Sequence, residues 1–95
     1  MKLVWSFEAI EDLISLRAYI AEESPAGAQR VLSRILHAVE DLLPQHPHMG
    51  RPGRVPGTRE LVIPRTPYIV PYRVQRETIQ ILRVYHSARR WPDSF

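Results

Sequence analysis

The sequence predicts an α+β fold with an N-terminal strand followed by an antiparallel helical hairpin that packs on a small antiparallel β-sheet. Two observations carry this prediction. Apolar residues recur at helical spacing through residues 7–43. β-Branched and aromatic residues then dominate three short segments between residues 59 and 85. Because 95 residues are enough for one core, residues 1–95 are expected to form a single domain.

Local start signals predict the first strand and the first helix. Residues 2–6 are expected to form a short strand. Ser6 is then a natural N-cap, and Glu8 complements the helix dipole from the first turn. The apolar spacing that follows predicts a helix over residues 7–22.

A second start signal predicts a second helix over residues 24–43. Ser24 offers a capping hydroxyl, and Pro25 suits the first helical position. Pro44 is expected to end this helix. Only a few residues separate the two helices, so they are expected to fold back on each other as a hairpin.

The middle of the chain, residues 44–57, is expected to be an irregular loop. Four prolines and three glycines in these fourteen residues disfavour regular structure. Arg51 and Arg54 in this loop are predicted to be exposed and to contact a phosphate group or a partner protein.

Three strands joined by short turns are expected after the loop, over residues 59–63, 68–74 and 78–85. Pro71 has no N–H for a ladder, so it implies a sheet edge, a bulge or an unpaired stretch. The strands are expected to form an antiparallel meander with the helical hairpin on one face. The other face is expected to stay open to a partner.

Charge divides the chain into two halves. Residues 1–50 carry four bases and seven acids, a net charge of −3, whereas residues 51–95 carry nine arginines and three acids, a net charge of +6. Arginine suits bidentate pairing with phosphate or carboxylate, so the second half is expected to meet a polyanion or an acidic partner. The alternative is an arginine-rich coding sequence with no functional meaning.

Composition and motifs argue against several classes of site. The chain has no cysteine, which excludes a disulfide framework and a thiolate metal site. His46 and His48 lie in a proline-bracketed loop without an accompanying acid, so no metal site and no cofactor are expected. The sequence has no signal peptide and no apolar run that could span a membrane, so a cytoplasmic protein without membrane contact is expected.

Four segments in order, residues 50–54, 57–61, 68–74 and 81–91, resemble the RelE/ParE toxin superfamily. The predicted order of one strand, two helices and three strands is also that of the superfamily. The resemblance implies a type II toxin that is produced together with a small antitoxin. The antitoxin would wrap the toxin and neutralise it in a hetero-oligomer.

The superfamily divides into two mechanisms. RelE- and YoeB-like members cut messenger RNA on the ribosome, whereas ParE-like members poison DNA gyrase and cut nothing. The loop glutamate, strand arginine and terminal tyrosine of YoeB-like nucleases fall here at Gly53, Ile69 and Ser87. RelE-like members use loop lysines, and this chain has no lysine after Lys2. The resemblance therefore favours a ParE-like gyrase inhibitor that is not an enzyme, with a ribosome-dependent mRNA endoribonuclease as the alternative.

Five arginines are predicted to bind the target: Arg59, Arg73, Arg83, Arg89 and Arg90. The first three lie on the predicted strands and are expected to line one face of the sheet. The alternative is ordinary solvated charge on an exposed sheet. Three arginines on one face favour a binding site more strongly than a single arginine would.

His86 and Trp91 each have two interpretations. His86 is the one match to the nuclease residues and would be catalytic in a nuclease, but a histidine at the end of a strand is more often a hydrogen-bonded structural residue. Arg83 lies three residues earlier, so in a strand the two side chains should face opposite sides. Trp91 suits stacking on a partner, although packing back onto the helical hairpin is the expected position of its ring.

Overall fold

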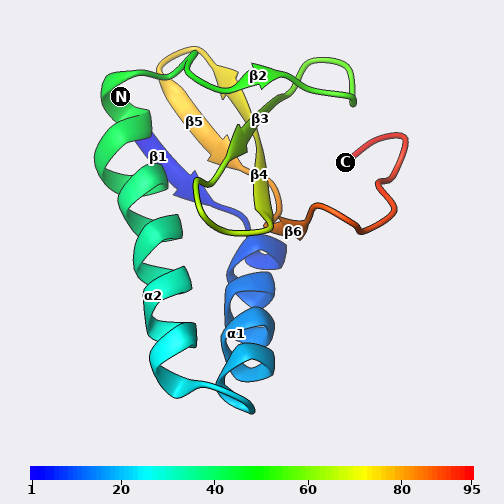
Figure 1. The fold of residues 1–95 in the computed structure, drawn as a ribbon. Helices are drawn as coiled ribbons and strands as arrows, with labels where there is room; N and C mark the ends of the chain where they lie inside the picture. The colour runs from blue at the N-terminus through cyan, green and yellow to red at the C-terminus, as the bar shows by residue number, and fades with distance from the viewer.

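A mixed sheet of six strands lies in the middle of the molecule, with two helices on one side of it (Figure 1). The computed structural model describes residues 1–95 without a gap. The elements in chain order are β1 (Lys2–Trp5), α1 (Phe7–Ala21), α2 (Pro25–Leu36), η1 (His37–Leu42), η2 (Leu43–Gln45), β2 (Arg51–Pro52), β3 (Arg59–Val62), β4 (Tyr68–Gln75), β5 (Thr78–Ile81) and β6 (Tyr85–His86). The α+β class and the helical hairpin are therefore confirmed.

Both helices begin at the predicted caps. The Ser6 hydroxyl accepts a hydrogen bond from the Ala9 N–H at 3.0 Å, and the Ser24 hydroxyl accepts one from the Gly27 N–H at 2.9 Å. These bonds satisfy N–H groups that have no acceptor within the first turn. Neither helix is long and apolar enough to cross a membrane.

The second helix changes form before its predicted end. After Leu36 the backbone becomes π-helical in η1 and then 3₁₀-helical in η2, so the expected single helix over residues 24–43 is wrong in its last part. Apolar spacing over six residues cannot separate these helical forms. Pro44 lies inside η2 rather than after it, because a proline in a first turn lacks only an N–H that needs no partner there.

The strand order is β1-β5-β4-β3-β2, and β6 pairs with the start of β4. The antiparallel meander of β3, β4 and β5 is confirmed. The first strand, β1, lies parallel to β5, with Lys2 opposite Thr78. The loop over residues 44–57 also contains β2, in which Arg51 pairs with Glu60, so the loop is less irregular than predicted.

The last predicted strand, residues 78–85, is broken. β5 ends at Ile81, and β6 begins at Tyr85. The break lies opposite Pro71, whose carbonyl accepts a hydrogen bond from the Leu82 N–H at 3.0 Å. The side of Pro71 that lacks an N–H therefore faces an irregular segment. Of the three possibilities that its position implied, this is the bulge.

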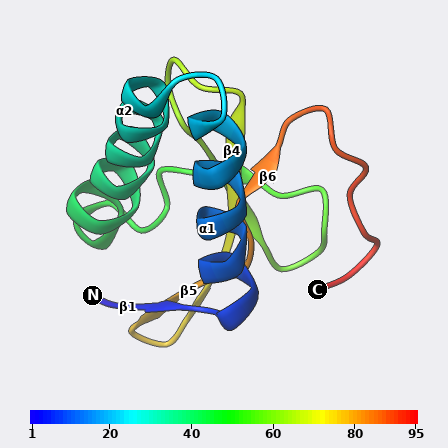
Figure 2. The same cartoon turned by 90° about the horizontal axis from the view of Figure 1, so that it is seen from below.

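The two faces of the sheet are covered by different parts of the chain. Helix-facing residues such as Val70, Tyr72 and Ile81 are buried with α1 and α2 in one apolar core. The opposite face, which we call the far face, is partly covered by the C-terminal residues 87–95 (Figure 2). Ile69 on the far face is buried opposite Tyr85. The expectation that this face stays open to a partner is therefore wrong for the half near β6.

Candidate functional site

A cavity of about 740 Å³ lies between the far face of the sheet and the C-terminal segment. We call it the arginine pocket, because four guanidinium groups line it: Arg73, Arg83, Arg89 and Arg90. Three aromatic side chains form part of its wall: Tyr85, Trp91 and Phe95. The pocket thus contains four of the five arginines that were predicted to bind a target.

Arg83 is held by α1 and is not a free cation. Its Nε and Nη2 atoms donate to the Asp12 carboxylate at 2.8 and 2.9 Å, and the Val84 N–H donates to the same carboxylate at 2.9 Å. These hydrogen bonds to Asp12 raise the pKa of Arg83 above its ordinary value, against the opposing effect of burial. The pair fixes the segment between β5 and β6 to the helix.

Tyr85 is the aromatic centre of the pocket wall. The Arg89 and Arg83 guanidinium carbons lie 4.4 and 4.8 Å from its ring centroid, within cation–π range. Trp91 contacts the Tyr85 ring edge-on, with the centroids 5.1 Å apart, and Phe95 lies at 6.2 Å. The C-terminal segment is thus attached to the sheet by ring contacts with a single buried tyrosine.

Three arginines of the pocket have no counter-ion within the chain, although Arg89 lies over the Tyr85 ring. The side chains of Arg73, Arg89 and Arg90 make no hydrogen bond and no ion pair. Arg73 lies on β4 directly opposite Gln80 of β5, and both side chains face the pocket. The structure thus places Arg73 of the predicted sheet-face group beside the same pocket as Arg89 and Arg90 of the C-terminal segment, a grouping that the sequence did not predict.

Arg59 does not belong to this group. It lies opposite Tyr72 in the β3–β4 ladder, whereas Arg73 is the next residue along β4 and therefore points to the other side. The Arg59 guanidinium donates to the carbonyls of Gly50 and His48 at 2.7 and 3.2 Å. The predicted face of Arg59, Arg73 and Arg83 is wrong, because strand register places Arg59 on the helix side.

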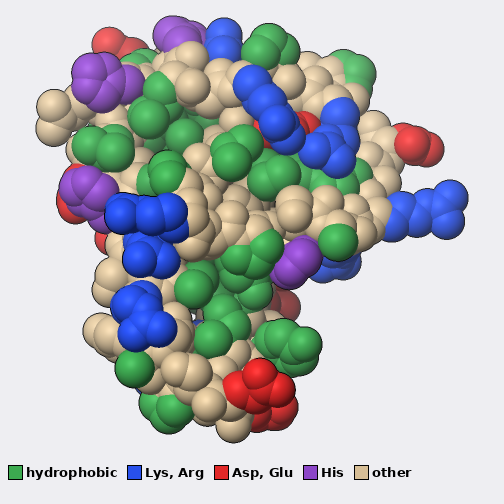
Figure 3. Space-filling model, in the orientation of Figure 1, with side chains coloured by type: hydrophobic (Ala, Val, Ile, Leu, Met, Phe, Trp, Pro, Cys, Tyr) green, Lys and Arg blue, Asp and Glu red, His purple; other side chains and the backbone are tan.

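Arg51 and Arg54 are also engaged within the chain. Arg51 donates to the Glu60 carboxylate through Nε and Nη2 at 3.1 and 2.9 Å. Arg54 donates through its backbone N–H, Nε and Nη2 at 2.8, 3.0 and 3.2 Å. Figure 3 shows basic side chains gathered around an acidic group over β2 and β3. Arg51 and Arg54 are therefore exposed, as predicted, at 51% and 44%, but their guanidinium groups pair with a carboxylate of the same chain.

Glu60 is the acid that pairs with both loop arginines, and the sequence did not indicate this role. Its side chain is only 2% exposed. Burial alone would raise the pKa of Glu60, but the hydrogen bonds from Arg54 and Arg51 together lower it below its ordinary value. The single available signal was an isolated acid on a strand that follows an arginine-rich loop.

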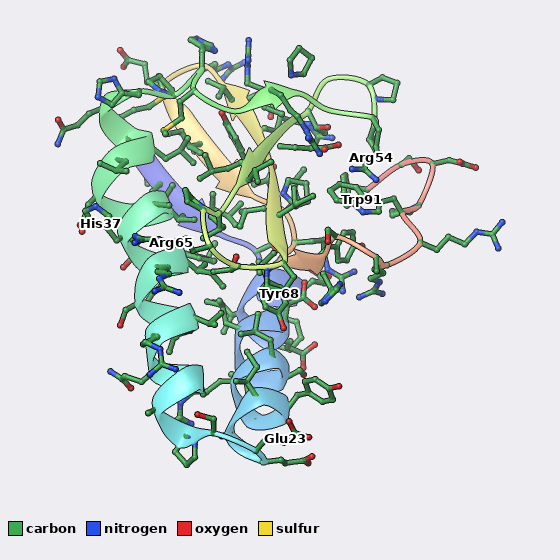
Figure 4. All side chains as sticks on the ribbon, in the orientation of Figure 1. Glu23, His37, Arg54, Arg65, Tyr68 and Trp91 are labelled. Atoms are coloured by element: carbon green, nitrogen blue, oxygen red, sulfur yellow. The ribbon has the colours of Figure 1, made fainter.

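Trp91 packs on the far face and not on the helical hairpin, so the expected position of its ring is wrong. The Arg54 guanidinium carbon lies 3.9 Å from the indole centroid (Figure 4). The indole is therefore held between Arg54 on one side and the edge of Tyr85. Its buried N–H has no hydrogen-bond acceptor in the chain.

His86 lies outside the arginine pocket. Its exposed ring packs against Tyr68, with centroids 5.6 Å apart, and Nδ1 accepts a hydrogen bond from the Ala88 N–H at 3.1 Å. Arg83 is turned toward α1 and the pocket, so the two side chains do not form one site.

The three positions where nuclease residues were expected cannot complete a site around His86. A Cβ atom at Gly53 would overlap the Thr58 side chain and lie 2.8 Å from its carbonyl oxygen. Ile69 is buried opposite Tyr85, and Ser87 is exposed. No three acidic, histidine or cysteine side chains lie close enough to share a metal ion.

The chain is similar in sequence to known toxins. The family described as the ParE toxin of the type II toxin–antitoxin system parDE matches residues 3–91. Putative toxin Y4kP of Sinorhizobium fredii is 44% identical over 96% of this chain and 93% of its own length. Toxin RelE2 of Caulobacter vibrioides is 35% identical over 93% of this chain and 97% of its own length.

Two solved structures share the fold. The chromosomal ParDE toxin–antitoxin system from P. aeruginosa contains a chain with a TM-score of 0.73 and 32% identity, over 90% of this chain and 95% of that one. The toxin–antitoxin complex RelBE2 from Mycobacterium tuberculosis gives a TM-score of 0.64 and 26% identity, over 93% and 92% of the two chains.

Proposed function

Because the chain belongs to the ParE toxin family of type II toxin–antitoxin systems, we propose that it inhibits DNA gyrase without cutting nucleic acid and that a cognate antitoxin neutralises it. One observation carries the gyrase proposal. His86 is the sole match to the nuclease residues, because the positions of the loop acid, strand arginine and terminal tyrosine hold Gly53, Ile69 and Ser87. The aromatic neighbour of His86 is Tyr68, which packs edge-on against its ring. Metal-free RNA cleavage needs a base, an acid and a cation around one phosphate.

A ribosome-dependent mRNA endonuclease is the second candidate. The similarity to toxin RelE2 and to the RelBE2 complex favours it. Under that function His86 would have to act as the general acid for the leaving oxygen. The two candidate functions therefore predict different effects of a substitution at His86 on toxicity.

Replacing His86 with glutamine is expected to leave toxicity largely intact. Glutamine can still accept the hydrogen bond from Ala88 but cannot exchange a proton near neutral pH. A nuclease that relied on this histidine would lose about 10²–10⁴-fold in rate. The measurement is growth arrest after induction at matched protein levels, with parallel readouts of the DNA damage response and of messenger RNA cleavage.

The wild type is expected to induce the DNA damage response and to leave ribosome-bound messages intact. Thermal melting of both proteins controls for folding. Codon-phased cuts in messenger RNA that disappear in the His86→Gln variant would establish the endonuclease instead.

The antitoxin is proposed to cover an apolar stripe on α1. Phe7, Ile10 and Ile14 follow each other at helical spacing and are 70%, 45% and 65% exposed. An exposed apolar stripe of this kind typically marks a protein interface. The related ParDE and RelBE2 structures are toxin–antitoxin complexes, which supports an antitoxin as the partner.

Ile14→Asp is expected to weaken antitoxin binding by about 10-fold to 100-fold, because a buried isoleucine contributes about 1.5–3 kcal/mol. Ser15→Asp is the matched control, since it adds the same charge at an exposed neighbouring position. The measurement is calorimetric titration with the product of the neighbouring antitoxin gene. Equal affinities for the two variants would remove α1 from the interface.

A further inference from the structure

The fold uses some of its arginines and leaves others free. Among the seven arginines that the sequence predicted for binding, Arg83 is paired with Asp12, Arg51 and Arg54 are paired with Glu60, and Arg59 is bonded to backbone carbonyls. The remaining three, Arg73, Arg89 and Arg90, all line the arginine pocket.

Three guanidinium groups without a counter-ion line one cavity, and Arg89 is in cation–π contact with Tyr85. Their like charges disfavour this arrangement unless an anion lies between them. The acid that lines the pocket is Glu8, which makes no ion pair with any of the three. Glu8, on the first turn of α1, acts on the charge of Arg83, so four arginines and one acid line the pocket. The side formed by Arg73, Arg89 and Arg90 is therefore strongly cationic and suited to binding an anion from outside the chain.

The number of cations indicates which anion fits. Within this chain one arginine and one backbone N–H satisfy the carboxylate of Asp12, and two arginines satisfy that of Glu60. Three arginines without a counter-ion carry more positive charge than one carboxylate neutralises, whereas a phosphate group has more oxygens and more charge.

The rest of the pocket suits the base of a nucleotide. Phe95 is 39% exposed and lies beside Tyr85, so it offers a ring face for stacking. The side-chain amide of Gln80 lines the same cavity and can form hydrogen bonds with a base edge. A volume of about 740 Å³ is larger than a lone phosphate needs and lies in the range of small-ligand sites.

We propose that the arginine pocket is a nucleotide site, in which Arg73, Arg89 and Arg90 bind the phosphate and the Phe95 side of the wall stacks on the base. The nucleotide is either a free mononucleotide or one nucleotide of a DNA strand. This site is separate from the α1 stripe, and inhibition of gyrase does not itself require it.

Trp91 provides a direct reporter. The other tryptophan, Trp5, is on the helix-facing side of β1 and donates a hydrogen bond to Glu40. In a Trp5→Phe background of the full-length protein, the emission therefore comes from Trp91 in the pocket wall. Adenosine monophosphate is expected to change this emission in a saturable way, and adenosine without a phosphate is expected to have little effect.

Arg73→Gln is expected to weaken the binding of adenosine monophosphate by about tenfold or more, because a charge-assisted hydrogen bond is lost. Arg76→Gln removes the same charge from the exposed hairpin tip outside the pocket and should leave the affinity unchanged. Arg90→Gln, on the C-terminal segment, should behave like Arg73→Gln and does not disturb a strand. Melting temperatures confirm that each variant is folded.

Two further titrations identify the source of the nucleotide. Tighter, strongly salt-dependent binding of a ten-nucleotide single-stranded DNA assigns the site to a DNA strand, whereas equal binding of the DNA and adenosine monophosphate assigns it to a free nucleotide. The proposal is overturned if neither probe affects Trp91, if Arg73→Gln and Arg76→Gln behave alike, or if hexaglutamate binds and the nucleotides do not.

Discussion

Replacing Asp12 with alanine is expected to destabilise the fold by about 2–4 kcal/mol, because one change removes three hydrogen bonds and leaves a guanidinium and a backbone N–H without their acceptor. The side chains of Arg83 and Asp12 are 25% and 13% exposed, so water compensates only a part of this loss. The free energy of unfolding from urea denaturation measures the effect.

Glu11→Ala is the matched control for this prediction. Glu11 is the exposed neighbour of Asp12 on α1, makes no ion pair, and should change stability by less than about 0.5 kcal/mol. If both alanine variants unfold at the same urea concentration, the Asp12–Arg83 pair does not stabilise the fold. The same pair affects toxicity assays, because a loss of toxicity in Arg83→Ala reports on folding. Arg73 has no such ion pair, so its replacement tests the arginine pocket without this effect.

Glu60→Gln is expected to reduce stability by about 2–3 kcal/mol at neutral pH, since a neutral amide cannot neutralise the Arg51 and Arg54 guanidiniums that face it. The folded protein lowers the pKa of Glu60 below its ordinary value of 4.5. The carboxylate therefore contributes stability that is fully present above about pH 4.5 and is lost as the pH falls through the lowered pKa.

The difference in unfolding free energy between the wild type and Glu60→Gln should consequently shrink as the solution is acidified from pH 7 toward pH 3. Glu77→Gln, at the exposed hairpin tip, should show neither the loss at neutral pH nor this convergence. Parallel stability curves for the wild type and Glu60→Gln over this range would contradict the assignment of a buried, paired carboxylate.

Elements governed by neighbouring residues could be predicted from the sequence. Ser6 and Ser24 cap helices through bonds to residues three positions away, so the start of each helix is a local property. The break between β5 and β6 and the position of β1 depend on contacts across the sheet. Pro71 indicated an irregularity but not which neighbouring strand would contain it.

The candidate site could be predicted only in part, because its contacts also join residues that are far apart in the sequence. A count of arginines treats all of them as available, but Arg83 meets a carboxylate 71 positions away in the chain. Arg59 was assigned to the wrong face because alternation along one strand does not reveal its register with the next strand. Arg73 on the sheet and Arg89 and Arg90 in the C-terminal segment line one pocket, but alternation along a strand could not reveal that the C-terminal segment folds over that face.

The parallel pairing of β1 with β5 also constrains when the protein can fold during its synthesis. Lys2 pairs with Thr78, so β1 can pair with β5 only after the ribosome has added 76 more residues. A pairing over such a distance requires closure of a long loop and forms late. Until residues 78–81 leave the exit tunnel, the sheet lacks a strand between β1 and β4. The nascent chain therefore exposes its apolar surface until then, and the complete sheet forms only after β5 has emerged.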